Sequence, residues 1–82
     1  MAENFGRVVK SLKGRDAGSL LAVIKTDENR LLVCDGKHRP LERPKSKNTA
    51  HLEFTGYILD ADSMTTNRKI RRALRGINEE VQ

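Results

Sequence analysis

The sequence is poor in the residues that build disulfides and aromatic binding surfaces. Its 82 residues include no tryptophan, one tyrosine, two phenylalanines and one cysteine. A single cysteine cannot form an internal disulfide, which favours a reducing cytoplasm. Three aromatic residues are too few for the base-stacking platform of an RRM or OB domain. The core must therefore be mostly aliphatic, and any contact with nucleic acid must rely on charge.

Long hydrophobic runs and an excess of acidic residues are also missing. The uncharged apolar stretch from Ser19 to Ile24 is far shorter than the roughly 20 residues of a membrane-spanning helix. The first five residues, MAENF, carry neither a basic nor an apolar segment, which predicts no signal peptide. Sixteen basic residues against 11 acidic ones give a net charge of +5 and a pI near 9.8. This balance indicates a polyanionic partner, and we expect nucleic acid rather than a membrane.

The first half of the chain predicts a meander of three short strands. The segments Val8–Leu12, Leu20–Ile24 and Leu31–Cys34 are rich in Val, Leu and Ile, and Gly, Asp or Asn closes each of them. Lys25–Arg30 predicts a charged turn between the second and third strands. Because Leu20–Ile24 is apolar throughout, we expect the central strand to be buried on both faces.

The middle of the chain predicts a hairpin and a loop. Asp35-Gly36 is typical of a type I′ turn, because this pair tolerates the positive φ angles that the turn requires. His38–Leu41 would be the returning strand, and Pro40 would confine it to an edge or a bulge. Arg43–Asn48 has no apolar residue except proline and predicts a mobile basic loop.

A fifth strand is expected at residues 51–57, with Leu52 and Phe54 pointing inward. It would close the strands into a barrel, which suits so short a chain because closure removes exposed sheet edges. We therefore predict a single, mainly β domain. Residues 1–57 would form a small SH3-like five-stranded barrel, and residues 58–82 a turn and one C-terminal α-helix packed on it.

The C-terminal segment has the period of an amphipathic helix. Its apolar residues at i, i+3, i+4 and i+7 are Ile70, Ala73, Leu74 and Ile77. Val81 continues this stripe. Gly76 lowers the helix propensity by about 1 kcal/mol, so we expect a helix over Thr66–Arg75. Ser63, Thr65 or Thr66 could cap its N-terminus.

The glycine spacing in the first half carries a resemblance to a known family. The segments concerned are Gly6-Arg7-Val8-Val9, Gly14-Arg15-Asp16-Ala17-Gly18 and Cys34-Asp35-Gly36. They resemble the KOW motif of ribosomal proteins and of NusG-type elongation factors. The pattern is most similar to the archaeal and eukaryotic large-subunit ribosomal protein family fourteen-e and its small bacterial relatives. Leu21 stands where elongation-factor motifs usually carry glycine, which favours the ribosomal branch.

This resemblance covers the first half of the chain and extends more loosely to about His51. It implies an SH3-like barrel of the KOW type that binds structured RNA, in particular ribosomal RNA, without catalysis. It also implies that the corner loop between the first two strands approaches RNA. We expect recognition of the phosphate backbone and of shape, with little reading of base sequence.

Three sets of cations are candidate phosphate contacts. In the corner loop they are Lys13 and Arg15, whereas Asp16 would hold the loop by accepting hydrogen bonds from backbone N–H groups. In the basic segment that follows Gly36 they are Lys37, Arg39, Arg43, Lys45 and Lys47. On the helix they are Arg68, Arg71, Arg72 and Arg75.

Each cationic set can also be a solvated surface that keeps a small protein soluble. The helical arginines destabilise their own helix slightly by like-charge repulsion. That local cost is compatible with phosphate binding, because a planar guanidinium binds phosphate through two donors.

Two other functions stay open. The chain could be an SH3-like adaptor in a transcription or ribosome-assembly complex, with Gly56–Met64 and the edge at Pro40 as the contact. It could also bind DNA through the arginine-rich helix, although a helix-turn-helix needs a second helix.

Cys34, Asp35 and His38 lie close together and could indicate metal or nucleophile chemistry. A zinc site needs four ligands, usually in paired spacing, and Cys34 in an apolar run is most simply a small buried hydrophobic residue. We expect no metal, no cofactor and no enzymatic activity.

Overall fold

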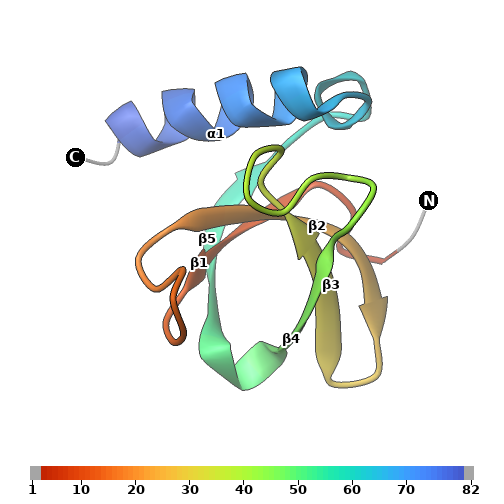
Figure 1. Ribbon diagram of the computed structural model, residues 1–82, viewed down its shortest axis with the longest axis vertical. Coiled ribbons are helices and arrows are strands. Elements are labelled where there is room, and N and C mark those ends of the chain that lie inside the picture. Colours follow the sequence, from red (N-terminus) through yellow and green to blue (C-terminus); the bar gives the residue numbers. More distant parts are fainter. Residues whose placement is uncertain (1–2, 81–82) are drawn as a thin grey trace.

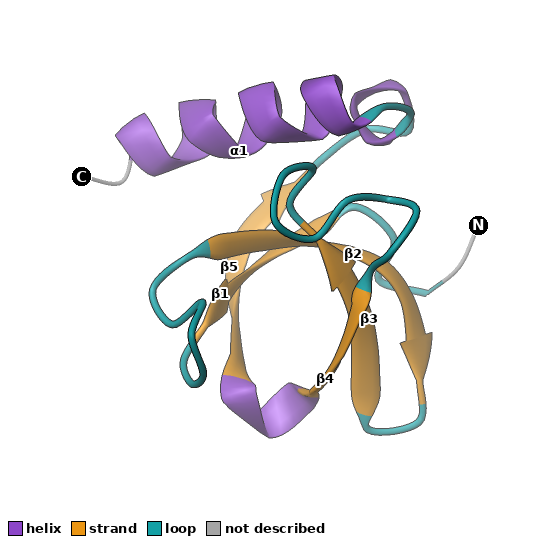
Figure 2. Cartoon of the chain, viewed as in Figure 1, coloured by secondary structure: helices purple, strands orange, loops and turns teal. Residues whose placement is uncertain are grey.

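A computed structural model describes residues 3–80, so the predicted end of the apolar stripe at Val81 lies outside the described residues. Five antiparallel strands form one sheet, and an α-helix follows (Figures 1 and 2). The strands are β1 (Arg7–Ser11), β2 (Leu20–Asp27), β3 (Arg30–Cys34), β4 (Lys45–Asn48) and β5 (Leu52–Ile58). The helical segments are the 3₁₀ turns η1 (Thr49–His51) and η2 (Asp62–Met64) and the α-helix α1 (Asn67–Glu80).

The predicted three-strand meander is confirmed. β1 pairs with β2, and β2 pairs with β3, all antiparallel. The turn between β2 and β3 is tighter than expected, because the ladder extends to the pair Asp27 and Arg30. Only Glu28 and Asn29 connect them, and Glu28 takes the positive φ (56°) that so short a turn requires.

The fourth strand is not where the sequence predicts it. Residues 38–41 form no strand, and the chain from 35 to 44 is a wide loop instead of a type I′ hairpin. The Asp35 carboxylate shapes this loop by accepting the N–H groups of Lys37 and Arg39, both at 2.8 Å. Side-chain capping of this kind replaces strand pairing.

The segment that predicts a mobile basic loop instead supplies β4, which pairs with β3 in register Leu31 with Lys47. The prediction of a loop is wrong, because a segment without hydrophobic residues can still form a strand by backbone pairing with its neighbour. β4 instead gains its stability from backbone pairing and from burial of the Lys47 side chain, whose aliphatic stem can pack like a hydrophobic residue.

The strand order is β4-β3-β2-β1-β5, so β4 and β5 are the two edges. The sheet is curled, and η1 joins its two edge strands (Figure 1). Within residues 3–80, however, no ladder pairs β4 with β5. The fifth strand is therefore confirmed, but it does not close the sheet by hydrogen bonding.

β5 pairs with β1 in an irregular register, and part of β5 is exposed. Between the pairs Arg7–Ile58 and Val9–Phe54, one β1 residue, Val8, faces three residues of β5. At this irregularity the Thr55 hydroxyl donates a hydrogen bond to the Val8 carbonyl oxygen at 2.9 Å. Leu52 is buried as predicted, but the inward prediction for Phe54 is wrong, since its side chain is 43% exposed.

Apolar side chains pack on both faces of the sheet, as the unbroken apolar run in β2 predicts. Successive strand residues alternate between two clusters. One cluster lies between the sheet and α1: Val8, Ala22, Cys34, Leu59, Met64, Ile70, Leu74 and Ile77. The other lies on the opposite face: Val9, Leu21, Val23, Leu31, Val33 and Leu52.

The helix is longer than the sequence predicts. Thr66 caps it by accepting the Lys69 N–H at 3.1 Å, as one of the three predicted caps. α1 continues through Gly76 to Glu80, because burial of Ile77 beyond the glycine offsets its poor propensity. No helix within residues 3–80 is long and apolar enough to cross a membrane.

Candidate nucleic-acid interface

The loop 35–44 is fastened to the first turns of α1. Asn67, the first residue of the helix, makes two side-chain hydrogen bonds to this loop. Its Oδ1 accepts the N–H of Leu41 at 2.8 Å, and its Nδ2 donates to the Glu42 carboxylate at 2.9 Å. These contacts fix the position of the loop relative to the helix.

Gly36 permits the closest approach between the loop and the helix. Its φ is +78°, and a Cβ at this position would collide with the main-chain oxygen of Asn67. Arg71 Nη1 donates to the Gly36 carbonyl at 2.9 Å. One arginine of the helical set is therefore anchored on the loop that carries Lys37.

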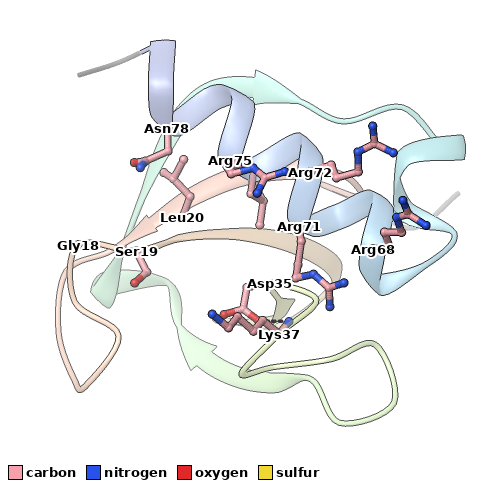
Figure 3. A pocket seen from close by; sticks show the side chains of 11 residues that line it. Gly18, Ser19, Leu20, Asp35, Lys37, Arg68, Arg71, Arg72, Arg75 and Asn78 are labelled. Atoms are coloured by element: carbon pink, nitrogen blue, oxygen red, sulfur yellow. Dashed lines mark hydrogen bonds between the residues drawn. The ribbon is translucent and has the colours of Figure 1, made fainter.

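The docked loop, the helix and the start of β2 border an open groove of about 980 Å³, which we call the arginine groove (Figure 3). Arg71 points from the helix toward Asp35 and Lys37 in this view. The structure thus brings Lys37, one of the five predicted cations of the basic segment, together with the four helical arginines. The groove is lined by Gly18, Ser19, Leu20, Asp35, Lys37, Arg68, Arg71, Arg72, Leu74, Arg75 and Asn78.

The charge of the arginine groove is almost entirely positive. Five of its lining residues are Lys or Arg, and Asp35 is the only acidic one. Asp35 Oδ1 is already engaged by two backbone N–H groups. Within residues 3–80, ion pairs join only Lys47 to Asp16 and Lys69 to Asp62, so no cation of the groove is in an ion pair with a carboxylate.

The corner loop between β1 and β2 has the shape that its glycines predict. Gly14 and Gly18 have φ angles of 92° and 90°, a region that favours glycine. The N–H of Gly18 donates to the Ser11 carbonyl at 2.7 Å and closes the loop. Lys13 and Arg15 project from it and are exposed.

Lys47 lies beneath this loop and is not a free cation. Its ammonium donates to Asp16 Oδ1 at 2.7 Å, to Ser11 Oγ at 2.8 Å and to the Lys13 carbonyl at 3.0 Å. Only 6% of its side chain is exposed. All three donors are used, so Lys47 leaves the set of candidate phosphate contacts.

Asp16 holds the corner loop, but not through backbone N–H groups as predicted. Partial burial alone would raise the pKa of Asp16. Hydrogen bonds from Lys47 and Ser11, together with the charge of Lys47, outweigh burial and hold this pKa below its ordinary value. The carboxylate is therefore ionised at neutral pH, and Lys47 compensates its charge.

A second basic depression of about 350 Å³, which we call the β4 hollow, lies between the corner loop, β4 and η1. None of the residues that line it is acidic. They are Lys13, Gly14, Arg30, Lys45, Ser46, Lys47, Asn48 and His51.

Arg30 and His51 were missed as site residues by sequence reasoning. Arg30 Nε donates to the Ser46 hydroxyl at 2.8 Å, and its Nη2 donates to the Ser46 carbonyl at 3.0 Å. No local pattern could place Arg30 there, because the contact exists only once β4 pairs with β3.

Three predicted cations line neither surface: Arg15, Arg39 and Arg43.

Cys34 is a buried core residue, as predicted. Burial and the nearby charge of Asp35 raise the pKa of Cys34 to about 11, so the thiol is protonated at neutral pH. Among residues 3–80, no three His, Cys, Asp or Glu side chains are grouped so that they could hold a metal ion.

No protein-family model matches the chain, and no curated protein matches it either. The resemblance to KOW proteins therefore rests on the quoted motifs alone.

Proposed function

We propose that this protein is a non-catalytic RNA-binding protein that recognises the phosphate backbone and shape of a structured RNA. The observation that carries the proposal is the arginine groove, in which Lys37 and four arginines meet with no compensating carboxylate ion pair. Phosphate oxygens provide that compensation, and binding releases the counterions that the RNA had condensed. Arginine suits this task because its planar guanidinium binds two phosphate oxygens at once.

Backbone recognition is favoured over base reading by the position of the aromatic side chains. Phe54 and Tyr57 belong to β5 and line neither the arginine groove nor the β4 hollow. The arginine groove therefore offers no aromatic ring on which an unpaired base could stack, and the only ring in the lining of the β4 hollow is the imidazole of His51. Recognition then depends on where phosphates lie, which in RNA reports the shape of the folded molecule.

The finer fold proposal is an SH3-like barrel of the KOW type. It is supported by the five-stranded curled sheet, by the 3₁₀ turn between its edge strands and by a glycine-framed first corner. We also propose a ribosomal RNA partner and a place in translation in the cytoplasm, both on the basis of the motif resemblance.

The direct test is the salt dependence of binding to a folded RNA hairpin, measured by fluorescence anisotropy. Arg72→Gln with Arg75→Gln removes two groove cations that make no hydrogen bond to the protein within the described residues. Each lost phosphate contact should flatten the slope of log K against log salt by about 0.7–0.9.

The matched control is Lys10→Gln with Lys25→Gln, which removes the same charge from exposed positions outside both surfaces. This pair should leave the slope nearly unchanged. Equal slopes for the groove variant and the wild type would remove the arginine groove from the interface.

The partner can be identified by sedimentation of a lysate through sucrose gradients at low and high salt. Comigration with large ribosomal subunits at low salt, lost at high salt, is expected. Migration with a protein complex at both salts would contradict RNA binding.

A second candidate function, a protein adaptor, is favoured by one observation. The edge strand β5 exposes three large apolar side chains, Phe54, Tyr57 and Ile58, the last of them 63% exposed. Other parts of the predicted adaptor contact do not fit, because Leu59 and Met64 are buried and Pro40 lies in a loop rather than on a strand. An adaptor would bind its partner with little dependence on salt.

A further inference from the structure

The two basic surfaces lie on different sides of the molecule. The arginine groove runs along α1, whereas the β4 hollow is built on β4 and η1, at the end of the sheet away from α1 (Figure 1). They share no lining residue. The corner loop lies between them, with Lys13 and Gly14 in the hollow and Gly18 and Ser19 in the groove.

The β4 hollow has the chemistry of a phosphate site in its own right. Lys13, Lys45 and Arg30 supply cationic donors, and no carboxylate lines the hollow. Arg30 is held in place by its two hydrogen bonds to Ser46. The nearest acid in the corner loop, Asp16, is already compensated by Lys47. An anion would therefore meet Arg30 in a fixed position beside two lysines, with no carboxylate in the lining of the hollow.

Lys47 gives the hollow a fixed shape. Its ammonium ties β4 to the corner loop through Asp16 and through the Lys13 carbonyl. The backbone of Lys13 is thus positioned while its side chain stays exposed. Preorganisation of this kind lowers the entropy that binding would otherwise cost.

We propose that the β4 hollow is a second phosphate-binding surface and that one protein molecule holds two RNA segments at once, one in each surface. The inference rests on the proposed RNA-binding function and adds its geometry. The protein would bridge two helices, or two distant parts of one folded RNA, with the corner loop between them. Linking two sites in this way raises the overall affinity without any further contact.

The test is the binding stoichiometry with an excess of a short RNA hairpin, measured by sedimentation velocity at low salt. A short hairpin that occupies one surface leaves the other available. The wild-type protein should bind two hairpins. Lys13→Gln with Lys45→Gln should bind one, because these substitutions remove two hollow cations and leave the Lys47 clamp intact.

The control pair Lys10→Gln with Lys25→Gln should still bind two hairpins. Arg72→Gln with Arg75→Gln should weaken one of the two binding events and leave the other. Wild-type binding that saturates at one hairpin would overturn the bridging proposal while supporting RNA binding. Two hairpins bound by the Lys13, Lys45 variant would also overturn it, and absence of all RNA binding would overturn both proposals.

Discussion

At the scale of single residues, Lys47 is the contact that joins the corner loop to β4. Its ammonium is shared by a carboxylate, a hydroxyl and a carbonyl, all within 3.0 Å. A buried lysine is tolerated only when such partners compensate for its lost hydration. Lys47 is therefore a structural residue in the lining of the β4 hollow.

Replacing Lys47 by methionine tests this role. The substitution keeps the aliphatic stem but leaves Asp16 without its counter-charge. We expect a loss of about 2 kcal/mol in the free energy of unfolding, below the 3–5 kcal/mol for a fully buried pair, because 20% of the Asp16 side chain is exposed.

Urea denaturation measures this change in stability. The exposed Lys25→Met serves as control and should change the free energy of unfolding by less than about 0.5 kcal/mol. If Lys47→Met were equally neutral, the Lys47–Asp16 pair would not hold the corner loop.

The same pair makes stability depend on pH in the acid range. The pKa of Asp16 is lowered in the folded protein from its ordinary value of 3.8. The stabilisation is therefore fully present above pH 3.8 and is lost as the pH falls through the lower folded value. Thermal unfolding between pH 6 and pH 2 should show this loss in the wild type and a smaller one in Asp16→Asn. Parallel curves for the two proteins would contradict the shift.

At the scale of elements, two glycines near α1 should respond in opposite ways to the same substitution. Gly36 has positive φ and no room for a Cβ beside Asn67, whereas a Cβ added to Gly76 would meet no atom within 4 Å apart from its chain neighbours and the backbone of its own helix. Gly36→Ala should lower the free energy of unfolding by at least about 1–3 kcal/mol through backbone strain, and the collision with Asn67 adds to it.

Gly76→Ala is the matched comparison and should stabilise the protein by up to about 1 kcal/mol, the propensity difference in a helix interior. Chemical denaturation of both variants measures the two changes in the free energy of unfolding. A neutral Gly36→Ala would mean that the loop 35–44 is not held against α1, and the arginine groove would lose its wall.

At the scale of the whole molecule, the two apolar clusters share the strands β1, β2 and β3. Neighbouring residues such as Val8 and Val9 point into different clusters. Neither cluster can therefore be lost without disturbing the strands that carry the other, and the chain should unfold in one step.

This prediction can be checked with one variant in each cluster. Ile70→Ala and Leu31→Ala remove side chains that are 0% and 1% exposed. Each should lower the free energy of unfolding by about 2–5 kcal/mol in a single transition. An early, separate loss of helical circular dichroism in Ile70→Ala would show that α1 unfolds independently of the sheet.

The sequence by itself determined the elements whose stability is local. The runs Val8–Leu12, Leu20–Ile24 and Leu31–Cys34 formed β1, β2 and β3 because pairing in one sheet buries apolar residues on both of its faces. Leu12 is the exception, since it lies beyond the end of β1 and is 48% exposed. The helix followed from its period, and the corner loop from Gly14 and Gly18.

Only the tertiary structure decided what long-range pairing controls. β4 carries no hydrophobic signal, and it exists because the free edge of β3 accepts it and because Lys47 meets Asp16 beneath the corner loop. The same pairing places Arg30 in the β4 hollow. The docking of the loop 35–44 on α1 joins Lys37 to the arginines. Charge density along the chain thus predicted which residues carry the positive potential, but their division into two surfaces depends on contacts between residues far apart in the sequence.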